Sequence, residues 1–170
     1  MKLYIVGPVG SGKTTLARRL SKELGVPRFH LDQVAHQRDR TAKIGNRKRP
    51  EAQRDAIFQG ILAREAFILE DTGRPCFAQG LEAADHILLL EPPTWVRLGR
   101  ILLRWVRQNL GKEPCSYRPT WTMLKDMFLW TRDYNTGEDG VRARAEQYSN
   151  KLTVVRSQEE LEQFLHNLPH

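Results

Sequence analysis

The stretch that decides the fold is GPVGSGKTT, residues 7–15. It follows a short apolar run, KLYIV at 2–6, and leads into the amphipathic run LARRLSKEL at 16–24. The segment from Gly7 to Thr14 fits the pattern G-x-x-x-x-G-K-[ST] in full. A preceding strand and a following helix distinguish a phosphate-binding loop from a chance match, and the flanking runs predict both.

Each part of this loop has a physical role in holding phosphate groups. Glycines let backbone N–H groups turn toward an anion, and the following helix directs its N-terminal N–H groups and dipole to the same place. Lys13 places an ammonium group at the outer phosphates, and the Thr14 hydroxyl can ligate Mg²⁺. We therefore expect ATP and Mg²⁺ as cofactors. The expected nucleotide-binding residues of the loop are Gly7, Gly10, Ser11, Gly12, Lys13, Thr14 and Thr15.

Beyond the loop, apolar runs alternate with helical patterns. The expected further strands are RFHL (28–31), FILED (67–71), HILLL (86–90) and LTVVR (152–156). The expected helices cover about 11–24, 50–65, 94–110, 121–134, 140–149 and the residues after 157. Ser157 and Glu160 predict a capping box for the last helix. The polar, basic segment 33–49 predicts a loop with some helix.

Wholly apolar strands separated by helices imply an α/β fold, a three-layer sandwich with a parallel sheet between helices. A chain of 170 residues fits one domain. Within it we expect an acceptor side at 33–65 and a lid-like arginine helix with its following segment at 94–136. Ligands of such sheets bind at the carboxyl ends of the strands. The candidates there are Gly7, Asp32, Glu70, Asp71, Glu91 and Arg156.

Three acids at these strand ends suit the chemistry of phosphate transfer. A Mg²⁺-dependent loop needs a nearby carboxylate, and strand alternation lets only one of Glu70 and Asp71 point toward it. We prefer Asp71, and a solvated strand end is the alternative for either acid. Asp32 could take a proton from an acceptor hydroxyl or hold a Mg²⁺-bound water, and a helix cap or turn is its alternative role. His30 is interpreted as structural.

Four arginines, at 97, 100, 104 and 107, fall within an arc of roughly 80° on the helix predicted at 94–110. No acid lies between Thr94 and Lys112 to compensate them. The planar guanidinium fork grips phosphate oxygens, so we interpret one or two of the last three arginines as closing over the triphosphate. A basic solvated face is the alternative.

The apolar residues of this region predict packing against a core. We expect Leu98, Leu102 and Trp105 to face a core from the other side of the arginine helix. The aromatic segment WTMLKDMFLW (121–130) reads first as a core helix, since aromatic residues at helical spacing usually pack inside. A dimer face and an acceptor cover are its alternatives.

Net charge and composition limit the classes of partner that we expect the protein to bind. The net charge of +7 favours anionic partners, including nucleotides, phosphorylated metabolites and nucleic acid. No helix-turn-helix, RNA-binding or zinc signature supports nucleic acid. No apolar run approaches the roughly 20 residues of a membrane span, so we expect no membrane partner. The first strand begins at Lys2, without room for a signal peptide, and the isolated Cys76 and Cys115 suggest a reduced, cytoplasmic protein. The oligomeric state stays open.

The runs GPVGSGKTTLARRLSKELGVPRFHLD, FILEDTG and ADHILLLEPP, with the arginine helix, resemble the DNA topology modulation proteins. These look like P-loop nucleotide kinases of the adenylate kinase and shikimate kinase type. The resemblance covers 1–32 and 66–110 well and 150–168 loosely. It implies a five-stranded parallel sheet in the order 2-3-1-4-5 and lid arginines on the helix after the fourth strand. It also implies adenine contacts near Arg156 and Ser157.

The same resemblance implies an acceptor site near Asp32 and Gly73, but EDTGRP stands where the family has a short aliphatic, Gly-rich motif, which leaves the acceptor open. The first hypothesis is an ATP-dependent kinase acting on a small acceptor such as a nucleotide or nucleoside. Its catalytic residues would be Lys13, Asp32, Arg100 and Arg104. The second is a nucleotide-dependent regulator or nucleic-acid-associated ATP-binding protein with little phosphotransfer.

Overall fold

The structure, a computed structural model, describes residues 1–39, 41–42, 45–113, 115, 117–134 and 140–168. Its central sheet has five parallel strands in the order β2-β5-β1-β6-β7. The bounds are β1 Lys2–Val6, β2 Arg28–His30, β5 Phe67–Asp71, β6 His86–Leu90 and β7 Leu152–Val155. The predicted order 2-3-1-4-5 is thereby confirmed. The inner strands are apolar on both faces because helices cover both sides of the sheet.

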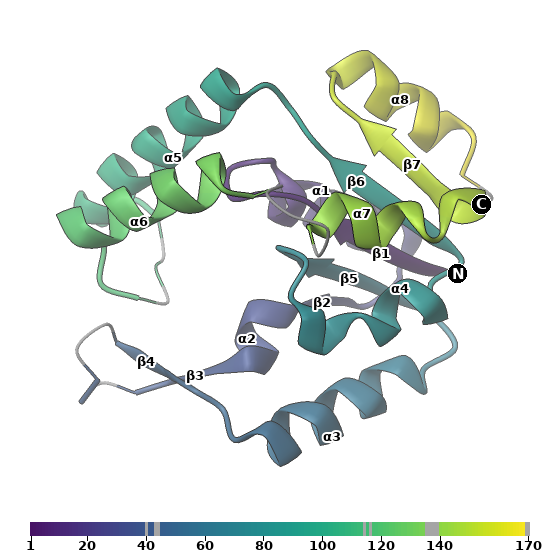
Figure 1. Cartoon of the computed structure of the whole chain (residues 1–170), viewed down its shortest axis with the longest axis horizontal. Coiled ribbons are helices and arrows are strands. Elements are labelled where there is room, and N and C mark those ends of the chain that lie inside the picture. Colours follow the sequence, from purple (N-terminus) through teal and green to yellow (C-terminus); the bar gives the residue numbers. More distant parts are fainter. Residues whose placement is uncertain (40, 43–44, 114, 116, 135–139, 169–170) are drawn as a thin grey trace.

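The sheet lies between two layers of helices, as Figure 1 shows. One layer holds α1 (Lys13–Leu24) and α8 (Gln158–His166). The other holds α2 (Leu31–Ala35), α3 (Glu51–Leu62), α4 (Gln79–Ala83) and α7 (Val141–Glu146). Alternate strand residues pack into the two layers, for example Ile68 against the first and Leu69 against the second. Single-turn 3₁₀ helices cover Pro75–Phe77 and Ser149–Lys151.

Two further helices, α5 (Thr94–Asn109) and α6 (Trp121–Arg132), lie side by side at one end of the molecule (Figure 1). Between them Ile101, Leu124 and Met127 form a small core of their own, and Val9 of the glycine-rich loop packs against it. The helix pair is therefore attached to the sheet beside the glycine-rich loop.

The packing predictions for this helix pair are confirmed for Trp105 and for the core side of α6, and they are wrong for Leu102, Trp121 and Trp130. Leu102 is 47% exposed, while Ile101 and the partly buried Trp105 pack into the small core. Trp121 and Trp130, expected in a core, are 70% and 54% exposed. The reason is that the buried side of α5 carries Ile101 and Gln108, so Leu102 and its apolar neighbours face outward.

The remaining differences concern element boundaries. The second strand ends at His30, and Leu31 begins α2, so Asp32 lies in the first turn of a helix and not at a strand end. The segment 33–49, expected to be loop with some helix, contains the end of α2 and an antiparallel hairpin of β3 (His36–Arg38) and β4 (Asn46–Lys48).

Helix ends also differ by a few residues from the expectation. Helix α1 begins two residues late, at Lys13, because the glycine-rich loop continues through Gly12. Pro50 and Pro93 are N-caps, since proline fixes φ but extended ψ values keep them outside the helices. The capping box of Ser157 and Glu160 is confirmed. No helix in the described part of the chain is both long and apolar enough to span a membrane.

Candidate active site

The glycine-rich loop and the first turn of α1 place Lys13 in a buried position. Its side chain is largely covered, and its Nζ donates hydrogen bonds to the carbonyl oxygens of Gly7 and Pro8, each at 2.7 Å. Burial lowers the pKa of Lys13 to about 8, and the nearby carboxylates of Asp71 and Glu70 oppose that decrease. Thr14 is half-buried and Thr15 is exposed, both in the first turn of α1.

Helix α5 rests directly on this loop. Gly10 has a positive φ of 77°, and a Cβ there would lie 2.8 Å from the carbonyl oxygen of Arg97. Since real Cβ atoms do not come that close to backbone atoms, only glycine allows both the loop turn and the approach of α5. The glycine at position 10 thus sets both the course of the loop and the position of the arginine helix.

The arginine stripe of α5 divides into residues with different contacts. Arg100 Nη1 donates to the carbonyl oxygens of Ser11 and Gly10, at 3.1 and 3.4 Å, and so lies across the loop. Arg104 is half-exposed and pairs with Glu113, which follows the helix, with 3.4 Å between Nε and Oε1. Arg107 lies at the exposed end of the stripe.

Arg97 is used by the helix pair itself. Its guanidinium donates to the carbonyl oxygen of Thr131 on α6, at 3.3 Å, and to Thr94 Oγ1, at 2.7 Å. It also lies over the ring of Tyr134. Arg97 therefore joins α5 to α6, which leaves Arg100 as the arginine of the stripe that contacts the loop backbone.

A second cluster joins Asp32, Arg74 and Asp71 at the ends of β5 and β2. Arg74 Nη1 donates to Asp71 Oδ1 and Arg74 Nη2 to Asp32 Oδ1, each at 2.5 Å. Burial opposes the charge of Arg74, but the two carboxylates outweigh it and raise the pKa of the guanidinium above its ordinary value. His36 Nδ1 lies 3.3 Å from the same Asp32 oxygen.

The acids Glu70 and Asp71 have separate partners, as strand alternation predicts. Asp71 also accepts hydrogen bonds from the backbone N–H groups of Gly73 and Arg74. Glu70 is fully buried, and its Oε1 lies 3.4 Å from Arg28 Nη1 and 3.6 Å from His30 Nδ1. Its Oε2 has no hydrogen-bond partner in the described part of the chain.

The turn after β5 depends on Gly73, which resemblance placed near the acceptor. It has a positive φ of 91°, and a Cβ there would lie 2.4 Å from Val141 Cγ2. Arg144, also on α7, donates a hydrogen bond to the Gly73 carbonyl. The turn that presents Arg74 is thus held between β5 and α7.

At the far end of the sheet, Arg156 follows β7 and is exposed. Its Nη2 lies 3.9 Å from Oε2 of Glu91, which follows β6. The backbone N–H of Arg156 donates to Glu160 Oε2 at 2.6 Å, so the capping box of α8 also orders this residue. The two strand-end candidates are thereby brought together, on the side away from Asp32.

Sequence reasoning missed Arg74, Arg144 and His36. Arg74 stands three residues after Asp71, next to a glycine at a strand end, and this spacing was the available signal. Its link to Asp32 crosses 42 positions of sequence and depends on the pairing of β2 with β5. Neither local pattern nor composition carries that information.

Comparison with solved structures identifies the architecture. A shikimate kinase from Acinetobacter baumannii in complex with shikimate matches with a TM-score of 0.55 and 18% identity, covering 99% of this chain and 94% of that one. A gluconokinase from Sinorhizobium meliloti 1021 matches with a TM-score of 0.51 and 15% identity, covering 97% and 87%. A shikimate kinase from Aquifex aeolicus matches with a TM-score of 0.52 and 14% identity, covering 98% and 94%.

No protein-family model and no curated protein sequence matches the chain. The resemblance to DNA topology modulation proteins therefore has no support beyond the motifs quoted above. At 14–18% identity the structural matches establish a shared fold. This chain has the P-loop kinase-like fold found in shikimate kinase and gluconokinase.

Proposed function

We propose that the protein is an ATP-dependent kinase that transfers a phosphoryl group to a small acceptor. The observation that carries this proposal is the position of two sites side by side. In the sheet Val6, which leads into the glycine-rich loop, pairs with Asp71, which belongs to the cluster of Asp32 and Arg74. A phosphate cradle and a carboxylate–arginine cluster thus occupy neighbouring strand ends, and Arg100 lies across the cradle.

The chain's own residues fit a nucleotide triphosphate with Mg²⁺. The glycine-rich loop supports this fit, because Lys13 Nζ lies against the Gly7 and Pro8 carbonyl oxygens and Arg100 lies across the loop, so that two cations are available to phosphate groups. The described residues contain no group of three or more His, Cys, Asp or Glu side chains able to hold a metal ion alone. Mg²⁺ would therefore depend on the phosphates, with Thr14 as ligand and Asp71 as support.

Each site residue then has a definite task, and bound Mg·ATP supplies the phosphoryl group and the metal charge that stabilises its transfer. The loop N–H groups and Lys13 bind the phosphates. Arg100 and Arg104 neutralise negative charge above the loop, Arg104 by exchanging its partner Glu113. Catalysis of this kind depends on positioning and electrostatics more than on covalent chemistry.

On the acceptor side, Asp32 would orient the acceptor hydroxyl and accept its proton. Arg74 holds this carboxylate in place by pairing with both Asp32 and Asp71. Arg156 and Ser157 would lie near the adenine base. The structural matches to kinases of small molecules support this class of acceptor and leave its identity open.

Calorimetry of nucleotide binding tests the first half of the proposal. Lys13→Ala is expected to abolish binding of Mg·ATP, because it removes the buried ammonium of the cradle. Lys22→Ala, which removes an exposed lysine from the last turn of the same helix, is the matched control and should bind as the wild type does. Equal affinities for the wild type and Lys13→Ala would contradict the assignment.

A further inference from the structure

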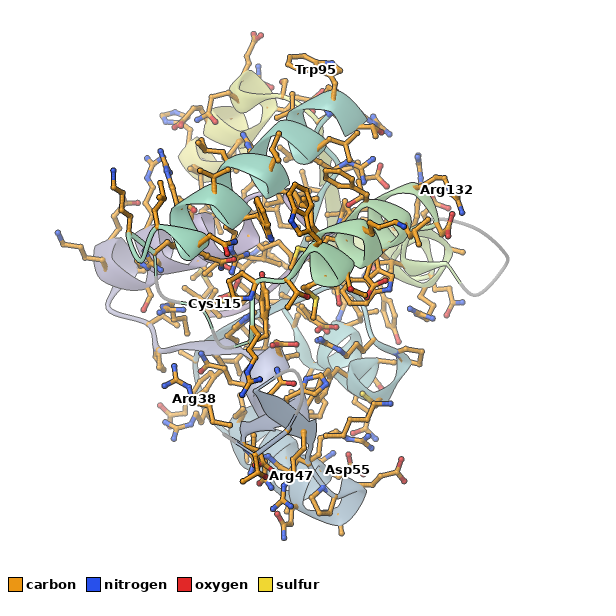
Figure 2. All side chains as sticks on the ribbon, turned by 90° about the vertical axis from the view of Figure 1, so that its left-hand side faces the viewer. Arg38, Arg47, Asp55, Trp95, Cys115 and Arg132 are labelled. Carbon is orange, nitrogen blue, oxygen red and sulfur yellow. The ribbon has the colours of Figure 1, made fainter. Side chains whose placement is uncertain are left out.

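Helix α5 has an outward apolar face that nothing in the described chain covers. Apart from Ile57, every exposed large apolar side chain among the described residues lies on α5, on α6 or directly after α5. Figure 2 looks onto this side of the molecule and shows Trp95 at the end of α5, directed away from the body. The α5 face consists of Trp95, Leu102, Leu103, Val106 and Leu110, from 39% to 76% exposed.

These five residues form a continuous stripe. At 100° per residue they fall within an arc of roughly 100°, centred roughly 130° from the arginine stripe. No charged residue falls in that arc. The inward side of α5 is the one that carries Ile101 and Gln108, so this apolar arc lies outward and meets solvent.

Gly99 lies within the same arc, in the interior of the helix. A glycine inside a helix lowers helix stability by about 1 kcal/mol relative to alanine, so a compensating role for Gly99 is expected. A Cβ at Gly99 would have no atom within 4 Å, so packing inside one copy of the chain supplies none. A second helix crossing the stripe at this point could approach closely.

The exposed apolar area of the stripe is comparable to the area that one partner buries in a protein–protein interface. Trp121 of α6 extends it by packing on Trp105, with ring centroids 4.6 Å apart. With Trp121, the exposed side chains present on the order of 700 Å² of apolar surface, close to the roughly 800 Å² that each partner buries in a standard interface. This exceeds the largest apolar patch of most monomeric proteins, which is about 300–600 Å².

We infer that a second copy of this chain covers the stripe, with the two α5 helices crossing antiparallel about a two-fold axis. An uncharged apolar stripe is complementary to itself, and a two-fold interface requires such self-complementarity. The arginines, which would repel across a dimer, lie outside the arc: Arg97, Arg100 and Arg104 each contact groups of their own chain, and Arg107 lies about 40° beyond the edge of the arc at Leu103.

The same arginine contacts argue against a lipid surface as the occupant. Helices that lie on membranes carry cations beside the apolar face, free to reach anionic headgroups. On α5 the cations nearest the loop are bound to the chain itself. A dimer would also fix the position of the helix that carries Arg100. Any effect on catalysis rests on the proposed function, whereas the dimer itself does not.

Sedimentation velocity over a range of concentrations tests the inference without reference to activity. The wild type is expected to sediment as a dimer. Leu102→Glu should raise the dimer dissociation constant at least about 100-fold, because it places two like charges in a desolvated apolar contact. Ile57→Glu, at an equally exposed apolar residue on α3, is the matched control and should leave the dimer intact.

Trp95→Ala provides a second variant that adds no charge, and it should also weaken the dimer, since buried tryptophans dominate interface energies. Circular dichroism melts of each variant separate interface loss from unfolding. A wild type that stays monomeric at about 100 μM, where even weak specific complexes form, would overturn the inference. So would a dimer that Leu102→Glu leaves unchanged, or a monomer that instead sediments with anionic vesicles.

Discussion

At Lys13, burial and the proposed contact with phosphate would act on the protonation of the same ammonium group. The pKa of the free residue is lowered to about 8 by burial, and contact with phosphate favours the charged form. Below pH 8 the ammonium is protonated with or without nucleotide, so affinity does not change through this group. Above pH 8 the complex holds the proton more tightly than the free protein does, so affinity for ATP falls as pH rises.

The predicted result is an ATP dissociation constant that is flat below about pH 8 and rises above it by at most about tenfold per pH unit. Calorimetry at pH 9 in buffers of different ionisation enthalpy should show proton uptake on binding. An affinity that is constant from pH 7 to pH 10 would contradict the linkage between Lys13 and the phosphates. Lys22→Ala should keep the wild-type profile, since Lys22 is exposed and distant from the loop.

Arg100 is the arginine whose loss should affect turnover most. It contacts the loop backbone at 3.1 Å, whereas Arg107 lies at the exposed end of the same stripe. Arg100→Met is expected to lower kcat by about 10²–10³ with a smaller effect on ATP affinity, as for other charge-stabilising donors. Arg107→Met should lower kcat much less. Steady-state kinetics measure kcat for both variants. Equal losses of kcat would contradict the special role assigned to Arg100.

The position of the motif residues was predictable because it depends on their neighbours in sequence, and their roles stay predictions. Lys13, Thr14 and the loop glycines follow from one local pattern, and the structure places Lys13 in a buried, loop-bound position. Arg74 was not predictable in the same way, because its bridge needs two strands to pair first. Charge pairs that form across the sheet leave no periodic signal in the chain.

At the scale of elements, the turn after β5 shows how one glycine positions a site. In Gly73→Ala the new Cβ would overlap Val141 and would also require a positive φ. We expect a loss of about 3 kcal/mol of unfolding free energy from these two effects together. Gly60→Ala is the matched control: it lies inside α3 with no atom near its Cβ, and it should stabilise by about 0.5–1 kcal/mol.

Urea denaturation of the two variants measures the difference. Adding Val141→Ala to Gly73→Ala should recover part of the loss, because the smaller side chain removes the overlap but not the backbone strain. If Gly73→Ala is as stable as Gly60→Ala, the contact with Val141 and the positive φ do not restrict position 73 to glycine.

The strands were predicted well because both faces of the sheet are buried. The inward side of α5 was predicted poorly because much of its exposed side is apolar. All five strands of the main sheet follow from apolar runs between helical patterns, since a parallel sheet is buried on both faces, whereas their order was implied by the family resemblance. Leu102 was assigned to a core because surface helices usually turn their apolar side inward. On α5 the inward side carries Ile101 and Gln108, between the arginines and the exposed apolar stripe, and no local pattern reveals which side a helix turns inward.

For the whole molecule, the central claim is that the cradle and the carboxylate–arginine cluster act together in phosphoryl transfer. The most direct test is transfer of label from [γ-³²P]ATP with Mg²⁺ to a panel of nucleoside monophosphates, nucleosides and small hydroxylated acids, with Lys13→Ala as the blank. The account predicts labelled product from one acceptor class, lost in Lys13→Ala and strongly reduced in Asp32→Asn. Tight ATP binding with only slow, acceptor-independent hydrolysis would contradict it and would favour a nucleotide-dependent regulator.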